Sequence, residues 1–180
     1  MLLVLALTGA SAQEAEEAAV EGAVEDSPEL SGTAMAAIGA FLAIAIAGFG
    51  SAKGLDIAGN AAAGVTGEDD KNFSSALVMD ALPQTQVIYG FIIAVLITLG
   101  IMGGEMTVEQ GWIAIAAGLA VGIAGLSAIN QGRVAAASIG ATAKNPGIKG
   151  KVLIFIVMPE IAALFGFVVA IMLLIGGNIF

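Results

Sequence analysis

The sequence contains no cysteine and no histidine, and only 12% of its 180 residues are charged. Thiol chemistry, disulfide bonds and the usual zinc or haem ligands are therefore excluded. Aromatic residues make up 6% of the chain, whereas hydrophobic residues make up 58%. Together with a mean hydropathy of +0.98, this composition indicates a polytopic membrane protein with little soluble mass. No globular catalytic domain fits in what remains, so we expect a chain that is not an enzyme by itself and that needs no organic cofactor or nucleic acid.

The acidic residues are concentrated near the N-terminus. The formal net charge is −9, and seven of the 15 acids lie between residues 14 and 29. The segment 13–30 contains Pro28 and no aromatic residue, so we predict a solvated, flexible tail. Residues 1–12 combine a short apolar run with Ala10-Ser11-Ala12, a pattern typical of a cleaved signal peptide. The alternative for this leader is an extra helical turn against the bilayer.

Four apolar stretches follow, at residues 33–57, 73–102, 112–139 and 152–176. Apolar runs of more than about 18 residues are candidates for transmembrane helices. The predicted fold is therefore an all-α membrane protein whose four transmembrane helices form two tandem hairpins, residues 31–104 and 105–180.

The basic residues predict the orientation of these helices. All of them lie in or beside the first and third loops: Lys53, Lys71, Arg133, Lys144, Lys149 and Lys151. The positive-inside rule then places these two loops in the cytoplasm and both termini outside. We expect a multi-pass protein of the cell membrane.

An internal repeat relates the two predicted hairpins. Pro83 and Pro159 are 76 residues apart, and the register slips by one residue near Gly48 and Gly125. The same spacing relates Gly90-Phe91 to Gly166-Phe167, Ser51-Ala52 to Ser127-Ala128, Gly64 to Gly140, and Thr66 to Thr142. A hairpin repeated head to tail commonly builds an array or a ring.

The first and third stretches are rich in glycine and alanine, whereas the second and fourth carry bulky Ile, Leu, Val and Phe residues. Helices with small residues approach one another closely within a bilayer. We therefore expect the small helices on the inside of a homo-oligomeric ring and the bulky helices toward lipid. The alternative is an ordinary four-helix bundle.

Glu160 is the candidate functional carboxylate. It lies inside the apolar run 152–177, where an ionised side chain costs at least about 2.5–3.5 kcal/mol. We expect Glu160 to be protonated or coordinated to a cation for most of the time. The first hairpin has the neutral Gln84 at the corresponding position, so each chain carries one titratable site instead of two.

Several neutral oxygens accompany this carboxylate. Leu82, Thr85, Gln86 and Tyr89 are spaced to lie on one helical face, and Pro83 leaves a backbone carbonyl in the preceding turn without its usual partner. With Gln131 in the third stretch, they form an all-oxygen set of the kind that hard cations favour. The alternative is that the glutamines only link helices by hydrogen bonds. Asp80 is interpreted as an interfacial or water-accessible group, with membership of the ion site as the alternative.

These residues resemble the duplicated proteolipid of rotary V-type and archaeal A-type ATPases, the c or K subunit. The resemblance covers about residues 33–177. It rests on the motif Leu82-Pro83-x-Thr85-Gln86-x-x-Tyr89-Gly90-Phe91, on Gln131, and on Glu160 followed by Gly166-Phe167. It implies a sodium ion held by the Leu82 carbonyl, Thr85, Gln86, Gln131 and Glu160, with Tyr89 hydrogen-bonded to the carboxylate. The prolines themselves, Pro83 and Pro159, predict helix breaks.

The resemblance also implies a mechanism and partners. The chain would form a rotor ring in lipid that carries Na⁺, or alternatively H⁺, on Glu160. A basic residue of the stator a or I subunit would release the ion, and central-stalk subunits would contact the cytoplasmic loops. Other subunits would hydrolyse or synthesise ATP. Two alternatives from other classes are a small four-helix pore and a secondary ion transporter that uses Glu160.

Overall fold

The computed structural model describes residues 30–180, and all its regular elements are helical over that range. The predicted leader and residues 13–29 of the predicted tail lie outside the described residues. Four helical segments are long and apolar enough to cross a membrane, namely Gly32–Glu68, Asp70–Gly103, Val108–Lys144 and Pro146–Gly176. The expectation of four membrane-spanning helices is confirmed, and each segment extends beyond the apolar stretch that predicted it.

Only the first of these segments is a single uninterrupted helix. The α-helices are α2 (Gly32–Glu68), α3 (Phe73–Asp80), α4 (Thr85–Gly103), α5 (Val108–Gly125), α6 (Ser127–Lys144), α7 (Lys149–Val157) and α8 (Glu160–Gly176). Short 3₁₀ turns join some of them: η1 (Asp70–Asn72), η2 (Leu82–Gln84) and η3 (Pro146–Ile148). At 1.5 Å per residue, the 37 residues of α2 span about 55 Å, well beyond the roughly 30 Å hydrocarbon core of a bilayer.

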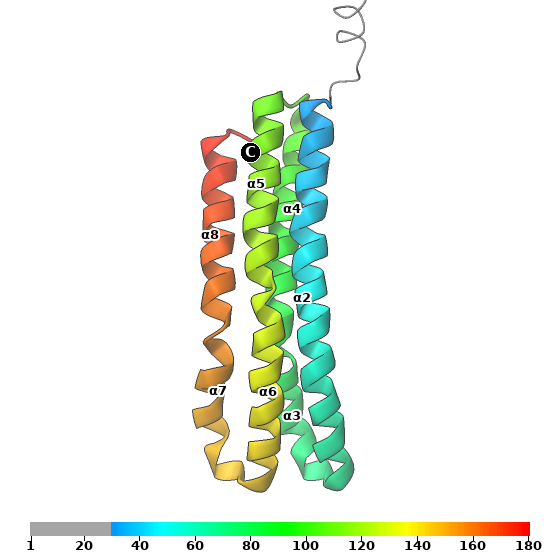
Figure 1. Ribbon diagram of the computed structural model, residues 1–180, viewed down its shortest axis with the longest axis vertical. Helices are drawn as coiled ribbons and strands as arrows, with labels where there is room; N and C mark the ends of the chain where they lie inside the picture. The colour runs from blue at the N-terminus through cyan, green and yellow to red at the C-terminus, as the bar shows by residue number, and fades with distance from the viewer. Residues whose placement is uncertain (1–29) are drawn as a thin grey trace, which may run out of the picture. The chain divides into compact units, whose positions relative to one another are not determined.

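The helices form two hairpins that lie side by side (Figure 1). We call α2, α3 and α4 the first hairpin, and α5, α6, α7 and α8 the second hairpin. The loops that contain η1 and η3 lie at one end of the molecule, and the α4–α5 connection lies at the other end with the C-terminus. Within the second hairpin, the Gln110 Nε2 donates to the carbonyl oxygens of Gly177 and Asn178, each at 3.2 Å, so the C-terminal residues are held against the start of α5.

Glycines bring α2 into close contact with α5 and α6. A Cβ added at Gly118 would clash with the Gly39 backbone, and one added at Gly132 would clash with the Gly54 backbone. Contacts of this kind replace the hydrophobic effect as the cause of helix association in lipid. The helices rich in small residues therefore pack directly against one another, as their composition suggests.

The segment Val108–Lys144 of the second hairpin is interrupted at Leu126, between α5 and α6. Around the interruption the backbone hydrogen bonds span three residues: the Leu126 N–H donates to the Ile123 carbonyl and the Ile129 N–H donates to the Leu126 carbonyl, both at 3.1 Å. The slip in the 76-residue repeat falls at this place, since Gly125 and Ser127 are one residue closer than Gly48 and Ser51. The missing residue thus coincides with a local break of the helix.

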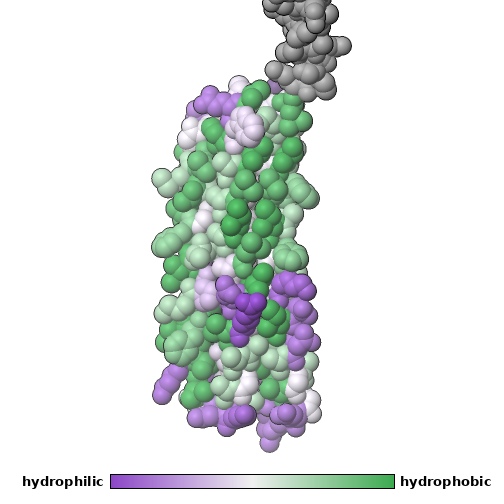
Figure 2. Space-filling view, viewed as in Figure 1, coloured by the Kyte–Doolittle hydropathy of each residue, from purple (hydrophilic) through white to green (hydrophobic). Residues whose placement is uncertain are grey.

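Two apolar clusters hold the hairpins together. One includes Ile93 and Ile97 of α4 with Ala170 and Leu174 of α8, and the other includes Met79 of α3 with Ile139 and Ile156. The outer surface is also apolar, and hydrophilic residues gather at the ends and in patches on the half of the molecule that carries the η1 and η3 loops (Figure 2). This surface is suited to lipid contact over most of its length.

Candidate ion-binding site

The site is built around the interruption between α3 and α4. Pro83 has no N–H group and lies in η2, after which α4 begins at Thr85. The N–H groups in the first turn of a helix lack intrahelical acceptors. For Val87 the acceptor comes from another helix, because the Ser51 Oγ of α2 accepts its N–H at 3.0 Å. Ser51 thereby fixes the start of α4 against α2.

Three oxygens from this interruption lie close together. The Thr85 hydroxyl is 3.1 Å from the Leu82 carbonyl oxygen and 3.3 Å from the Gln86 Oε1. The Leu82 carbonyl accepts hydrogen bonds from both the hydroxyl and the backbone N–H of Thr85. Non-helical backbone at membrane depth is tolerated where it is buried in protein, and Gln86 is fully buried here.

Two amides connect these oxygens to the carboxylate. The Gln86 Nε2 donates to the Gln131 Oε1 at 2.6 Å, and both side chains are fully buried. The Gln131 Nε2 in turn donates to the Glu160 Oε2 at 3.4 Å. Gln131 of α6 therefore links Gln86 of the first hairpin to the acid of the second hairpin.

Tyr89 completes the surroundings of the carboxylate. Its hydroxyl donates to the Glu160 Oε1 at 2.8 Å. Its ring stacks on Phe167, with 5.1 Å between ring centroids and an interplanar angle of 27°. The stacking fixes the direction of the hydroxyl, because a tyrosine ring has only two rotatable bonds to restrain.

Glu160 is the first residue of α8, directly after the turn that contains Pro159. The partial positive charge at a helix N-terminus favours a negative group at this position. The side chain is partly buried, so it is supported by protein on one side and borders the apolar outer surface on the other.

The structure brings together every residue expected at the ion site. Leu82, Thr85, Gln86, Gln131 and Glu160 form one hydrogen-bonded chain that ends at Tyr89. The role of Ser51 was not foreseen. Its repetition as Ser127 was visible in the sequence, but no periodicity indicates that a serine of α2 accepts from the backbone of α4.

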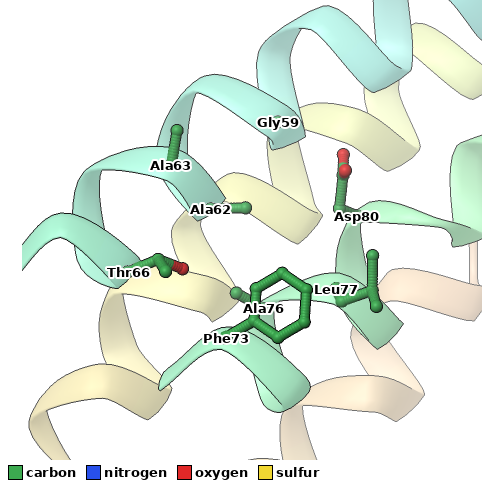
Figure 3. A pocket seen from close by; sticks show the side chains of 8 residues that line it. All are labelled: Gly59, Ala62, Ala63, Thr66, Phe73, Ala76, Leu77 and Asp80. Carbon is green, nitrogen blue, oxygen red and sulfur yellow. The ribbon is translucent and has the colours of Figure 1, made fainter. Parts of the chain in front are cut away.

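Asp80 lies apart from this chain of contacts. It is the last residue of α3, two residues before η2 begins, and lines a separate pocket with Gly59 of α2 (Figure 3). No hydrogen bond joins Asp80 to a site residue within residues 30–180, and its Oδ1 is buried there without a partner.

The donor set favours a monovalent cation. One carboxylate with neutral hydroxyl, amide and carbonyl oxygens gives a site that a single positive charge neutralises. No group of three or more acidic side chains that could hold a metal ion occurs within the described part of the chain, whereas divalent-ion sites usually collect several carboxylates.

Sequence comparisons identify the family. The family of the ATP synthase C subunit matches residues 38–97 and 115–173. The two matched segments correspond to the two hairpins, and together they cover more than half of the chain.

Individual relatives agree with this match. The chain is 49% identical over 142 residues to the K subunit of the A-type ATP synthase of Methanocaldococcus jannaschii, covering 79% of this chain and 62% of that protein. It is 41% identical over 145 residues to the K subunit of the V-type sodium ATPase of Enterococcus hirae, covering 80% of this chain and 92% of that protein. A 26% identity over 151 residues, 83% of this chain and 96% of that protein, relates it to the 16 kDa proteolipid of the V-type proton ATPase of Rattus norvegicus. With its duplicated membrane hairpin, this chain belongs to the family of the ATP synthase C subunit.

Proposed function

We propose that this chain is a rotor-ring subunit of an A/V-type rotary ATPase or ATP synthase and that it carries one cation across the membrane on Glu160. The observation that carries the proposal is the carboxylate itself, which accepts from Tyr89 and Gln131 within an apolar membrane helix. The family match and the two K-subunit relatives support the same role. The chain has no catalytic role in ATP chemistry, which belongs to other subunits.

The bilayer couples ion binding to rotation in this proposal. When Glu160 faces lipid it must be neutral, because a bare charge there costs several kcal/mol. When it reaches the stator, a basic residue of that subunit stabilises the free carboxylate and releases the ion. A membrane potential contributes about 2.3 kcal/mol per charge per 100 mV, which is close to the low estimates of about 2.5–3.5 kcal/mol for the cost of a bare charge in the bilayer.

We infer that the preferred cation is Na⁺, with Leu82, Thr85, Gln86, Gln131 and Glu160 as ligands. The Thr85 hydroxyl already lies 3.1 Å from the Leu82 carbonyl oxygen and 3.3 Å from the Gln86 Oε1. A proton would need only one carboxylate oxygen and would leave this oxygen cluster without a role. The sodium ATPase relative supports sodium as the cargo.

The ion assignment is tested by labelling Glu160 with a hydrophobic carbodiimide, which modifies protonated carboxyl groups, at fixed neutral pH with and without sodium. We expect sodium to slow the labelling, because bound sodium keeps Glu160 ionised and covered. Potassium at equal ionic strength is the control. Labelling that depends on pH alone and ignores sodium would assign the ring to protons.

We also propose that the η1 and η3 loops face the cytoplasm, that they contact the central stalk, and that both termini are outside. Four of the six basic residues, Lys71, Lys144, Lys149 and Lys151, lie in or beside these loops, whereas Lys53 and Arg133 lie within α2 and α6. The two loops share one end of the molecule (Figure 1). A cysteine introduced at Asn145 should then react with impermeant maleimide only from the cytoplasmic side. Reaction from the outside in intact cells would reverse the topology.

Residues 1–12 are proposed as a cleaved leader, which N-terminal sequencing of the mature chain would test.

A further inference from the structure

One side of the first hairpin is hollowed and lacks a partner from the second hairpin. A pocket of about 290 Å³ is lined only by residues of α2 and α3, including Gly59, Ala63, Thr66 and Asp80 (Figure 3). A larger apolar hollow of about 470 Å³ lies farther along the same hairpin, lined by residues of α2 and α4 that include Phe91 and Ala94. Both hollows are open within residues 30–180.

The second hairpin has the same pocket, and there it is filled. At the 76-residue spacing, Ala63, Thr66 and Asp80 correspond to Ile139, Thr142 and Ile156. These three residues are buried, and Met79 of the first hairpin packs among them with no exposed surface. The Met79 Sδ lies 4.0 Å from the Thr142 Oγ1. The contact between hairpins within one chain therefore shows what fills a pocket of this shape.

The residues that correspond to these fillers are exposed. Met79 corresponds to Phe155, whose side chain is 61% exposed. The stacked pair Tyr89 and Phe167 corresponds to Phe165 and Phe91, which are 69% and 57% exposed. If the repeat preserves the geometry, Phe155 of a second hairpin would fill the Asp80 pocket of a first hairpin, and Phe165 would stack on Phe91. Within one chain these residues remain exposed, so the partner hairpin must belong to another copy.

The charges at the loop end of the two hairpins are complementary. The loop of the first hairpin carries Glu68, Asp69 and Asp70, with Lys71 as its one cation, whereas the second hairpin carries Lys144, Lys149 and Lys151 at this end. Glu68 and Lys144 occupy corresponding positions of the repeat. A first hairpin and a second hairpin therefore attract one another at this end whether or not they belong to the same chain.

We propose that the second hairpin of another copy of this chain covers the hollowed side of the first hairpin, with its Phe155 in the Asp80 pocket and its Phe165 against Phe91. The inference rests on the proposed ring function and adds the register of the contact between neighbouring copies. It makes this contact an apolar seam at the depth of the ion site. There Gln86, Gln131 and Tyr89 correspond to Ala162, Leu55 and Phe165, which offer no side-chain oxygen.

Cysteine cross-linking tests this register, since the natural chain contains no cysteine. In membranes that contain the assembled complex, a Phe91→Cys, Phe165→Cys double variant should form a ladder of covalent oligomers after treatment with a short bismaleimide. A Tyr89→Cys, Phe167→Cys variant should cross-link within single chains and give no ladder. The matched control for position is Phe91→Cys with Leu164→Cys, which moves one cysteine about 100° around α8 and should give no ladder.

A ladder from the Leu164 pair but not from the Phe165 pair, in rings of normal size, would overturn the proposed register while leaving the rotor function intact. If the natural chain does not assemble into rings, and its Glu160 is not protected by sodium, the rotor function is overturned as well. A second measurement uses Phe155→Ala, which should lower the temperature at which the ring dissociates in detergent. Ile154→Ala is its control, because Ile154 is similarly exposed at 59% in the isolated chain. Equal effects of the two substitutions would show that Phe155 does not occupy the pocket.

Discussion

The two hairpins share one backbone plan but supply different parts of the ion site. The first hairpin contributes neutral oxygen atoms from Leu82, Thr85, Gln86 and the hydroxyl of Tyr89, whereas the second contributes the charge of Glu160 and the bridging amide of Gln131. Neither hairpin alone holds a complete set. The difference shows that the site lies at the junction of the two repeats, with one carboxylate in it rather than two.

The largest expected effect on ion transport comes from replacing Glu160 with the residue that the first hairpin has at the corresponding position. Glu160→Gln copies Gln84 of the first hairpin and nearly preserves side-chain volume, so the ring should still assemble. Ion transport and coupled ATP turnover should be abolished, because no carboxylate remains to bind the cation at this depth. Sodium uptake into vesicles that contain the whole complex measures this. Retained, carbodiimide-sensitive transport would contradict the role of Glu160.

A smaller effect is expected when one neutral ligand is removed. Gln131→Ala should weaken sodium protection of Glu160 about 10- to 100-fold, since losing a polar contact to a charged group costs about 1.5–3 kcal/mol. Protection by protons at low pH should remain. Gln84→Ala is the matched control because Gln84 is exposed and lies outside the hydrogen-bonded chain of the site. Equal sodium concentrations for half-protection in both variants would show that Gln131 only links the helices.

Substitution of the two corresponding serines, Ser51 and Ser127, should affect the stability of the protein differently. Ser51→Ala leaves the Val87 N–H without its acceptor and should destabilise the first hairpin by about 1–2 kcal/mol. Ser127→Ala should be close to neutral, because the Ser127 Oγ is buried without a hydrogen-bond partner in the described part of the chain. Thermal unfolding of the detergent-solubilised protein compares the two variants. A larger loss of stability in Ser127→Ala would reverse the assignment.

The smallest effect is expected at Asp80. Asp80→Ile copies Ile156 of the second hairpin and replaces a carboxylate with an unpartnered, buried oxygen. An apolar residue of similar size in place of a poorly paired buried charge is often neutral or stabilising. We expect the ring to dissociate at a slightly higher temperature and to transport sodium at an unchanged rate. Slower transport would instead place Asp80 on the path of the ion.

The apolar stretches predicted the helices. The carboxylate in an apolar run, the helical spacing of Leu82, Thr85, Gln86 and Tyr89, and the family resemblance together predicted which residues lie near Glu160. A glutamate in an apolar run is informative because the bilayer penalises it, and spacing on one helical face identifies the oxygens that accompany it. The loop-side ends of the helices were predicted too short, since α2 continues for 11 residues beyond residue 57 to Glu68. The apolar stretches marked the bilayer, whereas helix formation continues into water wherever alanine-rich sequence permits it.

Contacts between distant helices could not be predicted in the same way. The bond from Val87 to Ser51 and the stack of Tyr89 on Phe167 depend on how the hairpins dock. The one-residue slip near Gly125 was visible in the sequence, but not its consequence, the interruption at Leu126. A deletion can be absorbed by a bulge, a tilt or a break, and only the surrounding helices determine which of these occurs.

The continuity of α2 has a mechanical consequence. In three of the four membrane segments a turn interrupts the helix, but α2 has hydrogen-bonded turns from Gly32 to Glu68. A broken helix can twist at its interruption, whereas a continuous helix transmits torque along its whole length. In a ring that turns against a stator, force applied near Glu160 would reach the η1 loop through α2 with little elastic loss. If the η1 loop contacts the central stalk, as proposed above, the uninterrupted α2 of each copy would transmit the rotation of the ring to it.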